Sequence, residues 1–143
     1  MPSQLLNVFI YDNSRKHRLK LENIARNYAE ENNIDTISVL STTRPNKILS
    51  LSFERPGLYF LNIDALEKKM NGIQFASEVR KHDIYGSIVF LTEQDIFADG
   101  PSDLAGRTIR SHISAMSFLP KDSAEYEKEI KECITAHVRK AGL

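Results

Sequence analysis

The sequence is poor in the features that mark several common classes of protein. It holds one cysteine, Cys133, in 143 residues, which excludes an intramolecular disulfide framework and a multi-cysteine metal site. The 19 basic and 19 acidic residues cancel, so the basic excess of a nucleic-acid binder is missing. No apolar run approaches the roughly 20 residues of a membrane helix, and the amino terminus does not resemble a signal peptide. We therefore expect a reduced, cytoplasmic protein that binds neither nucleic acid nor membranes directly.

The composition that remains is that of an ordinary globular domain. Hydrophobic residues make up 41% of the chain and charged residues 27%. A chain of this length favours one domain over two, and no linker or internal repeat divides it. We expect a single domain over residues 1–143, with no output domain after it.

Short apolar runs alternate with segments of helical periodicity along the chain. The runs lack polar alternation, as is typical of strands that are covered on both faces. Residues 93–112 are polar and irregular, and a short fourth helix is expected there. The alternation predicts an α/β fold with a five-stranded parallel sheet between two layers of helices. The expected strands are 6–11, 34–40, 58–63, 87–92 and 115–119, and the clearest helices are 14–32, 73–79 and 123–137, with a weak one over 45–52. Ser123 is expected to cap the last helix, which carries on its apolar side Tyr126, Ile130, Cys133, Ile134 and His137.

Polar side chains follow four of the five expected strands. In an open parallel sheet, ligands bind just beyond the carboxyl ends of the strands, so these residues should lie together. Taken singly, each also fits an ordinary role, such as a helix cap or a surface lysine. Their joint placement favours a common pocket. The residues are Asp12 and Asn13 after the first strand, Asn62 and Asp64 at the third, Thr92 at the fourth and Lys121 after the fifth.

The segments that surround these positions resemble the receiver domain of two-component response regulators. Within that family the chain is most similar to the quorum-sensing regulators of the Agr and competence type, which carry a LytTR DNA-binding domain after the receiver. The resemblance implies a flavodoxin-like (βα)5 three-layer sandwich, and it covers nearly the whole chain except the region around 93–112. The segments that carry it are 8–13, 58–64, 70–73, 77–83, 88–92, 115–122 and 133–137.

The resemblance also implies a site for phosphoryl transfer from the histidine of a sensor kinase. Asn62 takes the position of the phospho-accepting aspartate, and Asp12 and Asn13 take the positions of the acidic pair. In the family these positions and a backbone carbonyl, here that of Asp64, hold Mg²⁺. Thr92 and Lys121 match the residues that contact the phosphoryl oxygens.

Phe118 matches the aromatic switch position of the fifth strand, but it has no hydroxyl group with which to bond Thr92. The stretch from Thr92 to Lys121 is also several residues longer than receivers usually show. The insertion falls where the family has its fourth helix, so we expect a remodelled output face.

Two departures concern the chemistry of the pocket. An amide at Asn62 is a poor nucleophile, and Asn13 removes a second negative charge. Magnesium prefers anionic oxygen ligands. Asp12 is the one carboxylate group expected to bind the metal directly, so we expect weak binding of Mg²⁺, if any. Lys121, which pairs with the acceptor carboxylate in the family, is expected to face an amide oxygen.

Three functions are open on these grounds. The first is a regulatory receiver that is not phosphorylated at Asn62 and acts through protein contacts. Its partner would be a protein or a second copy at the face of the fourth and fifth helices, and a sensor histidine kinase is a further candidate. The second is a conventional receiver of a LytTR-type regulator with an Asp→Asn change. The third is a small flavodoxin-like binding protein, although no Gly-rich phosphate loop follows the first strand. No catalytic set of side chains is apparent, so an enzyme is not expected.

Overall fold

The computed structural model describes residues 5–50, 56–62, 72–92 and 115–142, in which strands and helices alternate. Residues 93–112, where a fourth helix is expected, lie outside these ranges. None of the helices within them is long and apolar enough to cross a membrane. The strands are β1 (Leu5–Tyr11), β2 (Thr36–Thr42), β3 (Leu58–Asn62), β4 (Ser87–Thr92) and β5 (Ser117–Pro120). The helices are α1 (Arg15–Glu31), α2 (Pro45–Leu49), α3 (Gly72–His82) and α5 (Tyr126–Ala141).

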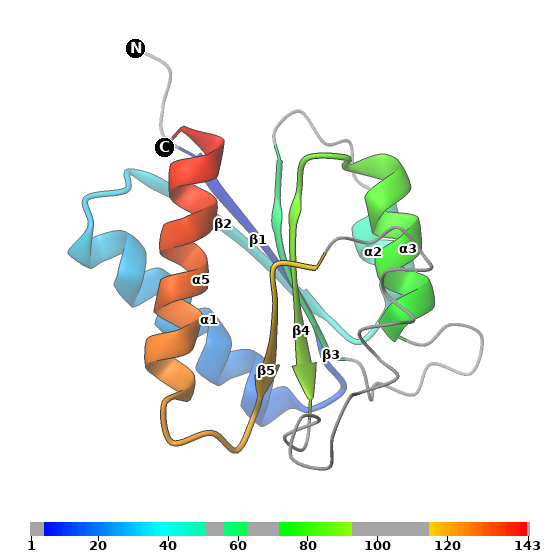
Figure 1. Ribbon diagram of the computed structural model, residues 1–143, viewed down its shortest axis with the longest axis horizontal. Helices are drawn as coiled ribbons and strands as arrows, with labels where there is room; N and C mark the ends of the chain where they lie inside the picture. Colours follow the sequence, from blue (N-terminus) through cyan, green and yellow to red (C-terminus); the bar gives the residue numbers. More distant parts are fainter. Residues whose placement is uncertain (1–4, 51–55, 63–71, 93–114, 143) are drawn as a thin grey trace.

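The five strands form one parallel sheet in the order β2-β1-β3-β4-β5 (Figure 1). Strand β1 therefore lies between β2 and β3, and the chain reverses its direction of travel across the sheet at the β1–β3 boundary. This boundary is the switch point at which open α/β sheets bind ligands. The predicted flavodoxin-like fold with a five-stranded parallel sheet is confirmed.

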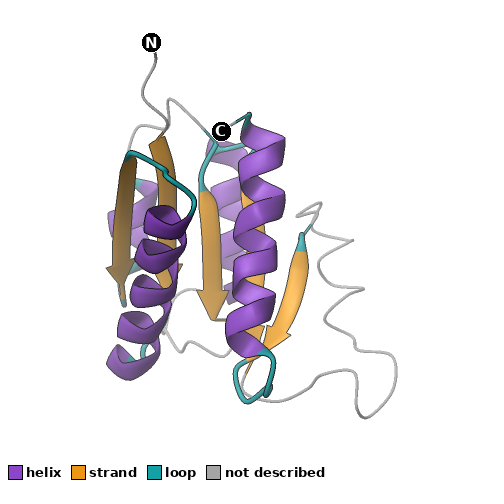
Figure 2. Cartoon of the chain, turned by 90° about the vertical axis from the view of Figure 1, so that its left-hand side faces the viewer, coloured by secondary structure: helices purple, strands orange, loops and turns teal. Residues whose placement is uncertain are grey.

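Helices cover both faces of the sheet, with α1 and α5 on one side and α2 and α3 on the other (Figures 1 and 2). Every residue of β3 and of β4 is buried, which explains why these strands are apolar without alternation. One core cluster joins the sheet to α1 and α5, and a second joins it to α2 and α3. The residues at the carboxyl ends of the central strands are therefore anchored to the packed core of the domain.

The second strand begins two residues later than predicted, because Ile34 takes part in the cap that follows α1. Asn33 adopts the left-handed conformation (φ 56°), which asparagine tolerates better than most residues. The amide of Ile34 then donates to the carbonyl of Ala29 at 2.9 Å, and that of Asn33 to the carbonyl of Glu30 at 3.4 Å. These two bonds satisfy two of the carbonyls in the last turn of the helix. The side chain of Ile34 packs against the core from this cap rather than from a strand.

The last helix also begins later than predicted, at Tyr126, with Glu125 as its N-cap residue. Ser123 was expected to cap it, but its hydroxyl accepts from the Glu125 amide at 3.1 Å and donates to Glu129 at 3.2 Å. Ser123 therefore organises the turn before the helix and not its first turn. The buried face of α5 consists of the residues predicted for it: Tyr126, Ile130, Cys133, Ile134 and His137.

Candidate functional site

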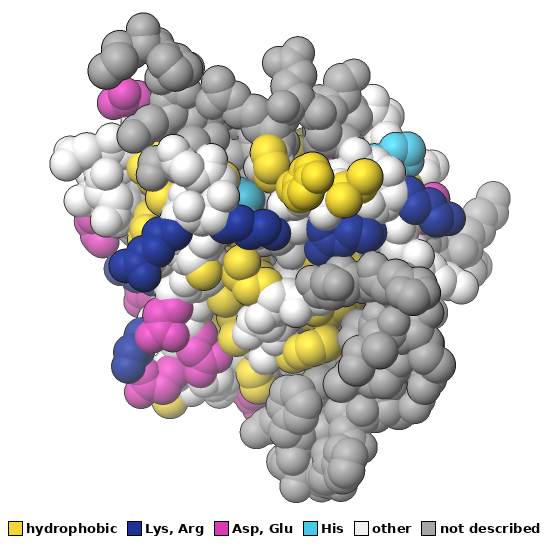
Figure 3. All heavy atoms as spheres, turned by 45° about the horizontal axis from the view of Figure 1, so that its top comes forward, with side chains coloured by type: hydrophobic (Ala, Val, Ile, Leu, Met, Phe, Trp, Pro, Cys, Tyr) yellow, Lys and Arg dark blue, Asp and Glu magenta, His cyan; other side chains and the backbone are white. Residues whose placement is uncertain are grey.

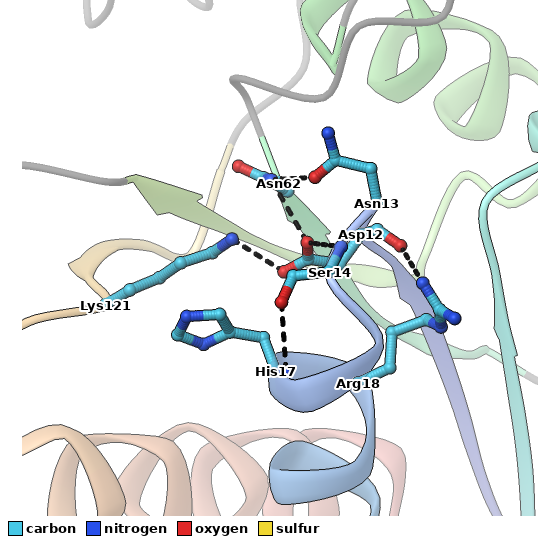
Figure 4. Close-up of polar contacts among 7 residues, drawn as sticks. All are labelled: Asp12, Asn13, Ser14, His17, Arg18, Asn62 and Lys121. Carbon is cyan, nitrogen blue, oxygen red and sulfur yellow. Dashed lines mark hydrogen bonds and ion pairs between the residues drawn. The ribbon is translucent and has the colours of Figure 1, made fainter.

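The residues predicted for the pocket meet at the carboxyl edge of the sheet. Asp12 and Asn13 follow β1, Asn62 ends β3, Thr92 ends β4 and Lys121 follows β5. Figure 4 shows the side chains of Asp12, Asn13, Asn62 and Lys121 directed toward one another. Asp12 and Asn62 are 1% exposed, Thr92 2% and Lys121 6%. Four of the five are thus removed from water, so their mutual contacts decide the properties of the pocket.

Asp12 lies at the centre of these contacts. Its Oδ1 accepts hydrogen bonds from the Ser14 amide at 2.8 Å and from Asn62 Nδ2 at 3.2 Å. Its backbone carbonyl accepts from the Arg18 guanidinium at 2.7 Å, and its backbone amide donates to the carbonyl of Thr42 at 3.3 Å. Ser14 also caps α1, since its hydroxyl accepts from the amide of His17. The start of α1 and the edge of the sheet therefore hold Asp12 in one position.

Lys121 forms a buried ion pair with this carboxylate. Its Nζ lies 2.7 Å from Asp12 Oδ2, and the two side chains are 2% and 1% exposed. The sequence argument placed the ammonium against an amide oxygen at Asn62 and did not assign it to Asp12. With no carboxylate at Asn62, Asp12 is the negative partner that the described pocket supplies.

The amide of Asn62 is oriented by its two acceptors. Its Nδ2 donates to Asp12 Oδ1 at 3.2 Å and to Asn13 Oδ1 at 3.4 Å. The opposite orientation would turn the amide oxygen toward a carboxylate oxygen, and two acceptors would then face each other in a buried site. The charge of Asp12 therefore selects the orientation in which the nitrogen of Asn62 faces the pocket.

The remaining predicted residues lie beside this cluster. The backbone amide of Lys121 donates to the carbonyl of Thr92 at 2.7 Å, which joins the ends of β4 and β5. The ring of Phe118 is half-buried and stacks on Phe90 of β4, with centroids 5.5 Å apart. Asp64, whose carbonyl was predicted to bind a metal, lies outside the described residues.

The described oxygen atoms do not fit a magnesium site as they stand. Magnesium requires oxygen ligands at about 2.0–2.1 Å in a nearly octahedral shell. Asp12 is the one carboxylate among the described pocket residues, and both of its oxygens already contact donors. The described parts of the chain also hold no group of three or more His, Cys, Asp or Glu side chains that could bind a metal ion.

Two residues near the pocket were not predicted to belong to it. Arg18 places a second cation on the backbone of Asp12, and its position one turn into α1 gave no signal in the sequence. Tyr126, predicted as core, is buried at the start of α5, and burial together with the charge of Asp12 raises the pKa of its hydroxyl. Its ring is covered by the ammonium of Lys20, 4.9 Å from the centroid.

A second polar cluster lies at the opposite, amino edge of the sheet. The buried carboxylate of Asp83 accepts from the amide of Gly57 at 2.8 Å and from the hydroxyl of Tyr59 at 2.7 Å. Burial and the hydrogen bond to Asp83 raise the pKa of Tyr59. A side chain at Gly86 would place its Cβ 2.6 Å from Asp83 Oδ2, so the close approach requires glycine. This cluster fixes the turn that leads from α3 into β4.

The same turn presents two apolar side chains to solvent. Arg80 Nη1 holds this turn by donating to the carbonyls of Asp83, Ile84 and Gly86 at 3.3, 2.8 and 2.7 Å. Burial lowers the pKa of the Arg80 guanidinium. Ile84 and Tyr85 are 68% and 71% exposed. Figure 3 shows hydrophobic and basic side chains next to each other on this face.

His137 of α5 reaches the same edge from the other face of the sheet. It lies on the predicted apolar side of this helix and is 1% exposed, and its Nδ1 lies 2.7 Å from the hydroxyl of Ser87. Burial, and then the charge of Lys140, lower the pKa of His137 to about 4. The charge of Asp83 and the carbonyl of Pro56 act in the opposite direction without overcoming burial.

Comparisons with known proteins find relatives in sequence and in fold. No family model matches the chain. The chain is 35% identical over 138 residues to accessory gene regulator protein A of Staphylococcus epidermidis, and 33% identical over the same length to that of Staphylococcus aureus. Each alignment covers 94% of this chain and 55% of the relative, so the chain spans about half the length of these relatives.

Solved structures share the fold at low sequence identity. The response regulatory domain of protein mrkE from Klebsiella pneumoniae superposes with a TM-score of 0.70 at 14% identity, covering 96% of this chain and 98% of that one. The response regulator TrrA of Thermotoga maritima, solved with Mg²⁺ and BeF, gives a TM-score of 0.62 at 18% identity, covering 90% of this chain and 98% of that one. By sequence the chain is related to accessory gene regulator protein A over about half of that protein's length, and its fold is that of response-regulator receiver domains.

Proposed function

We propose that this receiver domain works without phosphorylation at Asn62 and regulates its partners through protein contacts. The observation that carries the proposal is the hydrogen bond from Asn62 Nδ2 to Asp12 Oδ1, 3.2 Å long, beside the 2.7 Å ion pair of Asp12 with Lys121. The group at the acceptor position is a hydrogen-bond donor beside an ion pair whose two charges balance each other. We infer that the amide of Asn62 has a structural role, as a hydrogen-bond donor, and does not act as a nucleophile.

The chemistry of an amide supports this proposal. In phosphoryl transfer to a receiver, a carboxylate oxygen forms a bond to phosphorus while the bond from phosphorus to the leaving group breaks. The nitrogen lone pair of an amide is delocalised into its carbonyl, so neither atom is a comparable nucleophile. The two hydrogen bonds of Asn62 Nδ2 to described residues go to acceptors, Asp12 and Asn13, which hold the nitrogen as a donor.

The second amide distinguishes this proposal from a conventional receiver with one Asp→Asn change. Asn13 stands at the other acidic position, and its Oδ1 accepts from Asn62. A single change at Asn62 would leave the acidic pair after β1 intact. The hydrogen bond between the two amides instead supports a pocket whose structure does not depend on a phosphoryl group.

The surface that we propose for protein contacts includes the outer side of α5. An open groove of about 700 Å³ runs along it, lined among others by Glu125, Lys128, Glu132 and Arg139. The first turn of α5 carries acidic residues and its last turn basic ones, so the helix offers both signs of charge. A protein partner, a second copy or a sensor kinase are the candidate occupants.

Incubation with Mg²⁺ and acetyl phosphate, followed by measurement of the intact mass, tests the proposal. The native chain is expected to keep its mass, because no carboxylate stands at the acceptor position. The Asn62→Asp variant restores that carboxylate and is expected to gain the mass of one phosphoryl group, which shows that the donor and the scaffold are competent. An adduct on the native chain would mean that another residue accepts phosphate, and the proposal would be wrong.

A further inference from the structure

We propose that the Lys121 ammonium group is the resident cation of this pocket and takes the place on Asp12 that a divalent ion would need. The native domain then binds no Mg²⁺ at millimolar concentration, and removal of the ammonium group opens a divalent-cation site. The inference rests on the proposed function, since both concern a pocket with one described carboxylate. It goes further by naming the group that excludes the metal.

The ligating atoms of Asp12 carry the argument. Oδ2 is 2.7 Å from Lys121 Nζ, and Oδ1 accepts from the Ser14 amide and from Asn62 Nδ2 at 2.8 and 3.2 Å. The backbone carbonyl of Asp12 accepts from Arg18 at 2.7 Å. A metal ion on Asp12 must therefore compete with a donor at whichever oxygen it uses.

The charges lead to the same conclusion. In the ion pair one carboxylate meets one ammonium group, and both side chains are at most 2% exposed. Charges interact more strongly in such a site than in water, so a divalent ion beside Lys121 would be repelled at short range. The guanidinium of Arg18 adds a further positive charge on the backbone of Asp12.

Lys121 is also held in place by its backbone. Its amide donates to the carbonyl of Thr92 at 2.7 Å, directly after the last paired residue of β5, Pro120. The side chain therefore leaves the edge of the sheet from a fixed position and points at Asp12 (Figure 4). Lys121 is buried, so its side chain cannot simply rotate into solvent to make room for a metal ion.

The test measures the thermal unfolding of four proteins with and without 10 mM MgCl₂, at equal ionic strength. Lys121→Met removes the ammonium group and keeps most of the volume, Lys121→Arg keeps the charge, and Asp12→Asn/Lys121→Met removes the carboxylate as well. We expect Mg²⁺ to raise the melting temperature of Lys121→Met by about 4 °C, as for a ligand with a dissociation constant about tenfold below its concentration. The native protein, Lys121→Arg and the double variant should not respond.

A direct titration covers the case in which Lys121→Met does not fold. Mn²⁺, followed by its electron paramagnetic resonance signal, is added to the native protein, which should leave the ion free at millimolar concentration. Stoichiometric binding by the native chain, or a folded Lys121→Met that ignores Mg²⁺, would overturn the inference. Neither result produces a phosphoryl adduct, so a failure here is distinguishable from a failure of the proposed function.

Discussion

Replacing Asp12 with asparagine is expected to lower the free energy of unfolding by about 3 kcal/mol at pH 7, because it leaves a buried ammonium group without its carboxylate. The ion pair is 2.7 Å long, and its two side chains are 1% and 2% exposed. A charge in such a place loses its hydration and depends on its partner. Urea unfolding followed by circular dichroism measures the change.

Two variants serve as controls for this result. Asp122→Asn removes a carboxylate from an exposed residue next to Lys121 and should change stability by less than about 0.5 kcal/mol. Adding Lys121→Met to Asp12→Asn removes the unpaired charge and should recover most of the loss. If Asp12→Asn were as stable as Asp122→Asn, the buried ion pair would not contribute as argued.

Acidification from pH 7 to pH 5 is expected to destabilise the native protein by about 2 kcal/mol more than the His137→Gln variant. The pKa of His137 is lowered to about 4 in the folded protein, mainly by burial, from 6.5 in an exposed histidine. Between these values the unfolded chain binds a proton that the folded chain does not. The stability is therefore complete above pH 6.5 and declines as the pH falls toward 4.

Glutamine can still form a hydrogen bond with the hydroxyl of Ser87, which lies 2.7 Å from His137 Nδ1. It does not titrate between pH 5 and pH 7. Other groups, carboxylates included, titrate in both proteins, so the difference between the two curves isolates the histidine. His82→Gln, a change at an exposed histidine, should follow the native curve. Parallel curves for the native protein and His137→Gln would show that His137 is protonated without loss of the fold.

The parts of the fold that were predictable are those set by patterns within one segment. Strand β4 begins and ends at Ser87 and Thr92 as expected, since both of its faces are buried and the four residues between its ends are apolar without alternation. The buried face of α5 follows from its helical spacing. Element ends were less certain, because Ile34 and Ser123 take part in a cap and a turn whose hydrogen bonds depend on backbone geometry.

The described members of the pocket could be grouped from the sequence, but their contacts could not be predicted. Parallel strands bring Asp12, Asn62, Thr92 and Lys121 to one edge, so their order along the chain was sufficient to group them. The partner of Lys121 depends on distances across the sheet that no spacing in the sequence encodes. The amino-edge cluster of Asp83, Tyr59 and Gly57 was missed for the same reason.

The central claim is that the pocket neither accepts a phosphoryl group nor responds to one. The most direct test compares ¹H–¹⁵N correlation spectra of the native protein and Asn62→Asp, before and after addition of Mg²⁺ and beryllofluoride, an unreactive mimic of the phosphoryl group. In Asn62→Asp a second carboxylate is present, so Lys121 and a cation no longer compete for one, and the amides of Asp12, Thr92 and Lys121 should shift. The account predicts that the native spectrum stays unchanged; shifts of these amides in the native protein would contradict it.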